Sequence, residues 1–441
     1  GNLGKAQTDA LRGSVLVERG ALRLVAKTEY LKTVSDGAVG QNHGLFARNT
    51  FDVALDNEGS FRARSRMASL NADYELGTGK LTYVFGWRRF SQFTFNDIDS
   101  SPVHRFHSHT GLRQTQWSHE ARWAGELAKG VELTAGGNAF RQTMAYEEDR
   151  IIPPNPLFFG GGRQKQRGWG LFAQGDWEVA PALTLTGGLR WSREAKAADV
   201  TFVRIRPACS VLAGTCPISG TNPSIPGEAN GFSDKRRWAN WSPKLGLTWE
   251  VDSRKTAYAH WSRAWRSGGY NLRVTQPAAF LANALAAGTP AFGAERVDGY
   301  ELGLMLATDD RRGSLNLALF ENRVRGMQRE VSQADGGSGL AQSIYNTANA
   351  RIRGFEAEAR FTVNSRLRLG ANLGHIDADY TRALYDISGD GAVNAVDLAL
   401  KLPRAPAWTW GLGVDAELPL GAVSAINASL RFQHRARFAY T

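Results

Sequence analysis

The chain has 441 residues, of which 42% are hydrophobic and 48 are glycine. No stretch approaches the ~18 consecutive apolar residues that a transmembrane helix requires, so a helical membrane protein is excluded. The net charge of +11 comes from 53 Lys and Arg scattered singly among 42 acidic residues, and the lack of a basic run or base-reading motif argues against nucleic acid as a partner.

The first residues, GNLGKAQTDALRG, are polar and strand-like, and no signal peptide is recognisable. We therefore expect the chain to begin inside a longer precursor. From about residue 60 one unit recurs, made of a strand of roughly ten residues, a tight turn, a second strand and a long irregular segment. The short turns are expected at Gly77-Thr78-Gly79, Ala180-Pro181-Ala182, Asp309-Asp310 and Pro419-Leu420-Gly421.

Within each strand, apolar residues alternate with polar or small ones, which is the period of two of a β-strand with two different faces. Residues 168–192 show the pattern clearly. One face carries Trp169, Leu171, Ala173, Trp177 and Val179, followed by Leu183, Leu185, Leu189 and Trp191. The same alternation returns in residues 70–87, 245–251, 300–319, 355–363 and 408–418.

Three features favour a transmembrane antiparallel β-barrel over a soluble β-sandwich. The paired strands stay apolar on one face for longer than the 5–6 residues typical of soluble strands. Tryptophans stand near strand ends, where indole rings lie at the lipid headgroups. Short turns also alternate with long loops, as periplasmic turns alternate with extracellular loops in outer-membrane barrels. The long loops are expected at 96–111, 148–166, 197–237, 268–297, 329–348 and 382–403.

The count is roughly sixteen strands, with the first short turn near Glu18-Arg19-Gly20. Since single-chain barrels have even strand numbers and end in the periplasm, we expect about 22 strands in the complete barrel. Residues 1–441 are thus predicted to be a partial barrel domain that lacks the last strands.

Three regions resemble TonB-dependent outer-membrane receptors of the iron-complex type. They are NWSPKLGLTWE with TAYAHWSRAWRSGGYN, DGYELGLMLATDD with LNLALFENRVRGMQ, and NTANARIRGFEAEARF with LRLGANLGHIDADYT, within residues 240–381. The resemblance implies a Gram-negative outer-membrane location, an N-terminal plug inside the barrel, and a short N-terminal box that binds TonB. We expect neither the plug nor the box within residues 1–441. It also implies active import of a scarce nutrient, such as a ferric siderophore or another metal chelate, with outer-membrane lipid around the barrel. The resemblance does not identify the residues of this chain that bind the substrate.

Two other functions stay open at this point, namely a passive porin-type channel and a surface adhesin. No arrangement of nucleophile and base stands out, so the chain is not predicted to be an enzyme. Five polar residues where a strand leaves the membrane are candidates for contact with an anionic chelate, because Arg pairs well with carboxylates. They are Arg263, Arg266, Tyr270, Asn271 and Arg273.

Cys209 and Cys216 are the only cysteines, and both fall in the predicted loop 197–237. Their even number, their close spacing and an oxidising outer compartment predict one loop-closing disulfide. Another loop holds His104, His107 and His109 near Asp97 and Asp99. Such imidazoles could hold a transition metal, but without a fixed geometry a solvated polar loop is the favoured interpretation.

Residues 386–397, DISGDGAVNAVD, match the spacing of an EF-hand calcium loop. A glycine at the sixth position, Gly391, suits the sharp turn of such loops, and an Asp at the twelfth resembles the dockerin variant. The alternative is a polar turn that uses the same residue types for turn chemistry. We expect a structural Ca²⁺ held by Asp386, Ser388, Asp390, Ala392, Asn394 and Asp397.

Overall fold

The computed structural model describes residues 3–154, 157–335, 339–421 and 424–440. Antiparallel strands make up most of it. In chain order they are β1 Ala6–Arg19, β2 Leu22–Ser35, β3 Ser60–Leu76, β4 Gly79–Asp97, β5 His107–Ala128, β6 Val131–Ile151, β7 Phe158–Ala180, β8 Leu183–Ile205, β9 Gly231–Asp252, β10 Lys255–Arg266, β11 Glu295–Ala307, β12 Gly313–Asp335, β13 Gly339–Asn364, β14 Leu367–Ala383, β15 Trp408–Pro419 and β16 Ala425–Arg435.

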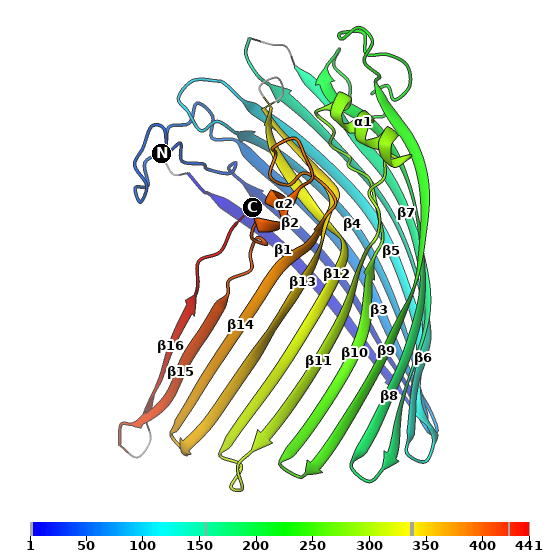
Figure 1. Cartoon of the computed structure of the whole chain (residues 1–441), viewed down its shortest axis with the longest axis vertical. Helices are drawn as coiled ribbons and strands as arrows, with labels where there is room; N and C mark the ends of the chain where they lie inside the picture. The colour runs from blue at the N-terminus through cyan, green and yellow to red at the C-terminus, as the bar shows by residue number, and fades with distance from the viewer. Residues whose placement is uncertain (1–2, 155–156, 336–338, 422–423, 441) are drawn as a thin grey trace.

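All sixteen strands belong to one sheet in which each strand pairs with its neighbours in sequence, from β1 to β16. The sheet curls into a barrel wall whose strands are tilted (Figure 1), as a barrel requires. The predicted all-β barrel, its strand number and its short turns are confirmed. The expected total of about 22 strands stays a prediction.

Apolar and polar residues alternate along the strands because successive side chains point to opposite faces of the wall. Leu171 and Leu189 lie on the outer face and are 58% and 48% exposed, as expected of side chains that meet lipid. Gln174 and Arg190 lie on the opposite face, where Arg190 donates a hydrogen bond to Asn138 at 2.5 Å. Polar lumen residues therefore satisfy one another across strands, while the apolar face is left for lipid.

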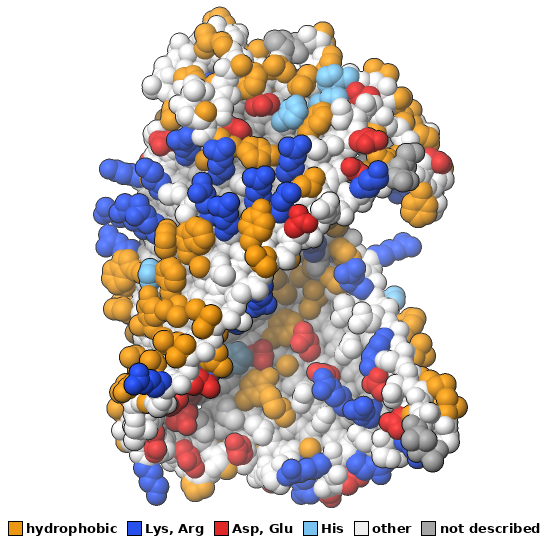
Figure 2. All heavy atoms as spheres, turned by 180° about the vertical axis from the view of Figure 1, so that it is seen from behind, with side chains coloured by type: hydrophobic (Ala, Val, Ile, Leu, Met, Phe, Trp, Pro, Cys, Tyr) orange, Lys and Arg blue, Asp and Glu red, His pale blue; other side chains and the backbone are white. Residues whose placement is uncertain are grey.

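Aromatic rings mark the upper edge of the lipid zone. On the outer face, Trp169 contacts Trp191 with ring centroids 4.3 Å apart, and Trp191 lies 6.2 Å from Trp241. Such rings sit at the headgroup level. Above this girdle the outer face carries a belt of exposed cations, which gather over a hydrophobic band in Figure 2. The belt includes Arg64, Arg89, Arg113, Arg141, Arg163, Lys165, Arg167, Arg193, Lys235 and Arg237.

The strands extend further out than the sequence analysis predicts. Most of the expected loop 148–166 is strand, and the described part of 329–348 is strand as well. The boundary predictions were wrong because they followed the apolar alternation, which ends where lipid ends. Backbone pairing continues in water; for example, β12 and β13 stay in register from Gln328 paired with Asn346 to Asp335 paired with Gly339.

Two helices lie at the extracellular end of the barrel, α1 Pro277–Ala287 and α2 Ala395–Ala399 (Figure 1). Among the described residues, none of the helices has the length and apolar character needed to cross a membrane. Instead, both belong to connections that fold onto the inner face of the wall. Each connection has its own buried apolar cluster, which holds it against the wall.

Candidate functional site

The connection between β10 and β11, residues 267–294, covers the inner face of β8 and β9. Its anchors are Tyr270, Val274 and Phe280, which pack against Val200 and Phe202. Both strand residues are fully buried although they lie above the lipid zone. Burial of these apolar side chains stabilises the docked connection, and each contributes about 1.5–3 kcal/mol when fully removed from water.

Local sequence explains the helix within this connection. Pro277 occupies the first turn of α1, where its missing N–H costs nothing. Gly288 ends the helix in the left-handed conformation with φ of 66°, and its N–H bonds back to the last turn. The chain then returns to the wall, where Gly269 and Phe292 form an antiparallel bridge.

Polar contacts hold the same connection to three different strands. The hydroxyl of Tyr270 donates to Asp234 at 2.9 Å, and Asn271 exchanges two hydrogen bonds with the backbone of Ile344. The guanidinium of Arg273 forms an ion pair with Glu148, at 2.7 Å. Glu148 is itself buried and accepts from Arg150 at 2.8 Å.

The rim residues singled out from the sequence thus fall into two groups. Arg263 and Arg266 pair with carboxylates of the neighbouring strand, with Arg263 2.7 Å from Asp298 and Arg266 3.2 Å from Glu295. The other three, Tyr270, Asn271 and Arg273, serve to dock the inward connection. Their expected contact with an anionic chelate stays a prediction.

The connection between β14 and β15, residues 384–407, also folds inward. Leu402 and Ile387 pack against Tyr380 and Ala350 on the lumen face. Tyr385 stacks on Tyr345 of β13 with centroids 4.3 Å apart and an interplanar angle of 14°. Burial raises the pKa of Tyr385 to about 12, so its hydroxyl stays neutral and can donate hydrogen bonds.

The six residues predicted to hold calcium form a tight turn that leads into α2. Asp386 accepts from the N–H groups of Gly389 and Gly391 at 2.7 and 2.8 Å. Asp397 is fully buried and accepts from Ile387 and Ser388 at the start of the turn.

Asn394 caps α2 and donates from its amide to Asp390 at 2.8 Å. The loop therefore gathers its carboxylates toward its centre through backbone hydrogen bonds. Such an arrangement suits either a turn or a cation site, and calcium binding stays a prediction.

A cavity of about 420 Å³ lies between the two inward connections. Arg236 and Trp238 contribute from the lumen face of β9, and the stacked pair Tyr345 and Tyr385 contributes from the other side. Aromatic faces, amides and a guanidinium converge here, the combination expected of a site for a planar, anionic ligand. We take this cavity as the candidate ligand site.

Sequence reasoning missed these four residues. Arg236 and Trp238 lie in a stretch that was expected to be a loop or the end of a strand. The only indication of their position was that they alternate with residues of the outer face. Tyr345 and Tyr385 lie 40 positions apart and meet only because the connection that carries Tyr385 folds inward onto β13.

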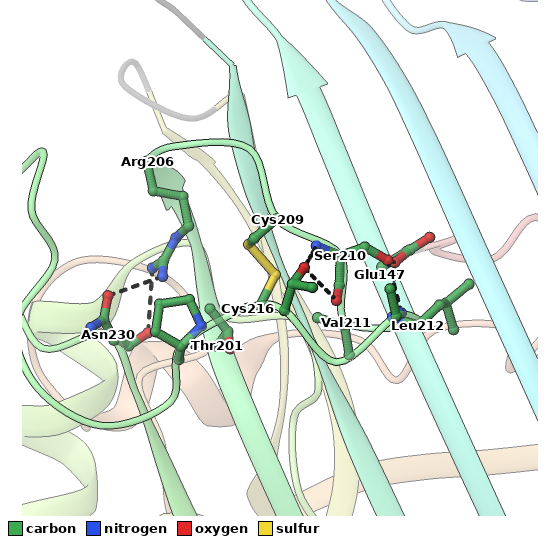
Figure 3. The surroundings of a disulfide bond; sticks show 12 residues. Glu147, Thr201, Arg206, Cys209, Ser210, Val211, Leu212, Cys216 and Asn230 are labelled. Atoms are coloured by element: carbon green, nitrogen blue, oxygen red, sulfur yellow. Dashed lines mark hydrogen bonds between the residues drawn. A yellow bond between two sulfur atoms is a disulfide. The ribbon is translucent and has the colours of Figure 1, made fainter.

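The predicted disulfide between Cys209 and Cys216 is present, with a Cα–Cα distance of 4.9 Å (Figure 3). It closes part of the connection between β8 and β9. Beside it, Glu147 accepts from the Ser210 hydroxyl at 2.6 Å and from the Leu212 N–H at 3.0 Å. The disulfide loop therefore lies against the extracellular end of β6.

The three histidines of the predicted loop 96–111 do not form one cluster. His104 and His107 stack with ring centroids 3.8 Å apart. His109 stacks instead on Phe95 at 4.4 Å, and burial lowers its pKa. The third partner of His104 and His107 is Asp56, which comes from the connection between β2 and β3 and lies 48 positions before His104.

A model of the TonB dependent receptor-like, beta-barrel family matches residues 14–441. The chain belongs to this family. Its location is accordingly the outer membrane of a Gram-negative bacterium, in agreement with the apolar band and the aromatic girdle of the outer face. The resemblance drawn from residues 240–381 is thereby confirmed.

Three solved receptors share the fold of this receptor barrel. The ferric yersiniabactin uptake receptor FyuA from Yersinia pestis is 15% identical, with a TM-score of 0.72 over 98% of this chain and 59% of that receptor. The siderophore receptor PiuA from Acinetobacter baumannii is 12% identical, with a TM-score of 0.69 over 94% and 63%. The ferric-catecholate import receptor Fiu from E. coli K12 is 14% identical, with a TM-score of 0.66 over 97% and 64%. The chain therefore spans less than two thirds of each receptor.

Proposed function

We propose that the chain is the barrel of an active transporter that imports a scarce nutrient across the outer membrane, energised through TonB. A ferric siderophore or a similar metal chelate is the cargo that the mouth suits best. The family match over residues 14–441 carries the proposal. A passive porin and an adhesin are the alternatives, and neither is favoured by that match. We assign no enzymatic reaction to the barrel.

The chemistry of the mouth cavity supports a chelate as cargo. Siderophore complexes are commonly anionic and carry flat ligand groups, which stack on aromatic rings and pair with guanidinium. Trp238 and the stacked tyrosines provide the rings. Arg236 provides the charge and is held in place by a hydrogen bond to the carbonyl of Gly288 at 3.0 Å.

The decisive experiment is uptake of radioactive iron by cells that express the gene encoding this chain. Cells with and without TonB are supplied with a panel of ferric siderophores at limiting concentration. Uptake of one of them that disappears without TonB supports the proposal. Uptake that persists without TonB, together with steady ion conductance of the purified protein in planar bilayers, would support the porin instead.

A pair of adjacent arginines provides a matched test of the cavity. Arg236 lines the cavity, whereas Arg237 faces outward in the cationic belt. We expect Arg236→Ala to weaken binding of the transported chelate at least about tenfold, since it removes a charge-assisted contact, and Arg237→Ala to leave it unchanged. Equal effects of the two changes would place the ligand elsewhere in the barrel.

A further inference from the structure

Two extracellular connections meet beside the outer face of the wall. Residues 36–59 join β2 to β3, and residues 98–106 join β4 to β5. The N–H of Asp56 donates to the carbonyl of Ser101 at 3.1 Å, and the amide of Asn42 donates to the carbonyl of Asp99 at 3.1 Å. The connections are thus docked on each other by one hydrogen bond between backbones and one from the side-chain amide of Asn42 to the backbone.

At this junction Asp56, His104 and His107 converge. Each offers one ligand atom, and the three atoms lie within 4.8 Å of one another. Nε2 of His107 is 2.8 Å from a carboxylate oxygen of Asp56. Among the described residues this is the single group of three or more His, Cys, Asp or Glu with such spacing.

Two further polar atoms at the same place are buried without a hydrogen-bond partner. One is Nε2 of His104, and the other is Oδ2 of Asp97. Asp97 is 5% exposed, and its carboxyl group lies beside that of Asp56. A buried polar atom left unpaired is unfavourable, and two facing carboxylates repel each other unless a proton or a cation lies between them.

We propose that Asp56, His104 and His107, with Asp97 beside them, form a binding site for a divalent transition metal, of which Zn²⁺ fits best. Zn²⁺ takes imidazole nitrogens and carboxylate oxygens in a four-coordinate shell. Ca²⁺ and Mg²⁺ prefer oxygen ligands in larger numbers, so the two imidazoles disfavour them. A cation held by the three ligands would engage the His104 imidazole and reduce the repulsion between the carboxylates of Asp56 and Asp97.

Two neighbouring side chains, those of Asp99 and His109, are not part of the cluster and have other contacts. Asp99 accepts from the N–H groups of Phe106 and Arg105, at 2.7 and 3.3 Å. His109 is stacked on Phe95. The proposed site therefore differs from the sequence prediction, in which His109 was grouped with His104 and His107.

The role of the metal is structural. Ser108 points to the lumen face, where its hydroxyl contacts Glu148. Because adjacent residues of a strand point to opposite faces, His107 points outward. The cluster therefore lies on the outer side of the wall, away from the mouth cavity. A metal here fastens the connection 36–59 to the connection 98–106. It is not on the path of the cargo, and the proposal is independent of the proposed transport function.

The test is metal titration of the tag-free protein in detergent after treatment with a chelator. We expect one equivalent of Co²⁺ to give the visible absorption of a tetrahedral nitrogen and oxygen site, and Zn²⁺ to displace it. The separate changes Asp56→Asn, His104→Ala and Asp97→Asn should each weaken Zn²⁺ binding at least about tenfold. His109→Ala is the matched control and should bind like the wild type.

Proteolysis supplies a second readout, because Zn²⁺ should protect residues 36–59 in the wild type and not in His104→Ala. Heat-modifiable migration on gels shows that each variant keeps its barrel. Binding that His104→Ala leaves unchanged, or the absence of any Zn²⁺-dependent protection in the wild type, would overturn the proposal and leave a hydrogen-bonded latch between His107 and Asp56.

Discussion

The hydroxyl of Tyr270 donates a hydrogen bond to Asp234 at 2.9 Å, and this contact joins the connection after β10 to the lumen face of β9. The Tyr270 ring is 6% exposed and belongs to the apolar cluster that packs the mouth. Burial and the Asp234 carboxylate both raise the pKa of the Tyr270 hydroxyl, so it remains a donor at any physiological pH.

Removing the Tyr270 hydroxyl should weaken the docking of the connection after β10 while the apolar cluster keeps its aromatic ring. Tyr270→Phe keeps the ring but deprives Asp234 of a partner, and we expect docking of residues 267–294 to weaken by about 1 kcal/mol. Hydrogen exchange of this segment measures the effect. Tyr300→Phe, whose ring is 42% exposed on the outer face, is the control. Equal exchange in both variants would show that the apolar cluster alone holds the connection.

The two faces of the wall should respond differently to charge. Leu189 faces lipid between the aromatic residues Trp191 and Trp177, whereas Gln174 lies on the lumen face. Leu189→Arg should destabilise the folded barrel by roughly 2–4 kcal/mol in a bilayer, because a cation enters hydrocarbon. Gln174→Arg should cost much less. Urea-dependent folding into lipid vesicles measures both, and similar costs would contradict the assignment of faces.

The disulfide should stabilise its own loop and leave the barrel intact. Reduction, or Cys209→Ser, releases a loop whose cysteines are 7 positions apart. Closure of so short a loop is worth about 2–3 kcal/mol in the chain-entropy account. We expect faster proteolysis within residues 206–230 and unchanged heat-modifiable migration. Loss of the folded barrel upon reduction would show that the bond supports more than its loop.

Calcium should protect the turn before α2 from protease. In calcium, cleavage within residues 384–407 should slow, and Asp390→Ala should abolish this protection because it removes the ligand at the fifth position of the loop. Asp310→Ala, in the turn between β11 and β12, is the matched control. If cleavage is the same with calcium and with chelator, the segment is a capped turn only.

The extracellular end of β6 should lose stability as the pH rises through the acidic range. Burial, with Glu147 and Glu148 nearby, raises the pKa of Asp149 from 3.8 to about 6. Between these values the folded state binds more protons than the unfolded state, so stability is fully present below pH 3.8 and falls as the pH approaches 6. Asp149→Asn should remove this dependence. Hydrogen exchange of residues 145–151 at several pH values provides the measurement.

Much of the barrel could be predicted from local sequence. The alternation in residues 168–192 predicted both faces of β7 and β8, because a strand surface in contact with lipid must be apolar at every second position. The turn at Gly77 was equally predictable, since it adopts φ of 57°, where glycine carries no steric cost. The disulfide followed from having two cysteines in one loop of an oxidising compartment.

The two sites depended on contacts that no local pattern records. Tyr345 and Tyr385 meet because a connection folds inward onto a wall above the lipid, where polar and apolar residues are both allowed and the alternation carries no signal. His109 has the spacing of a ligand but stacks on Phe95, whereas Asp56 comes from another connection and completes the cluster. The sequence by itself determined the wall, because lipid and hydrogen bonding between adjacent strands impose a local rule on each residue. Only the tertiary structure decided the mouth and the proposed metal site, because loops that fold in water are held by side chains far apart in the chain.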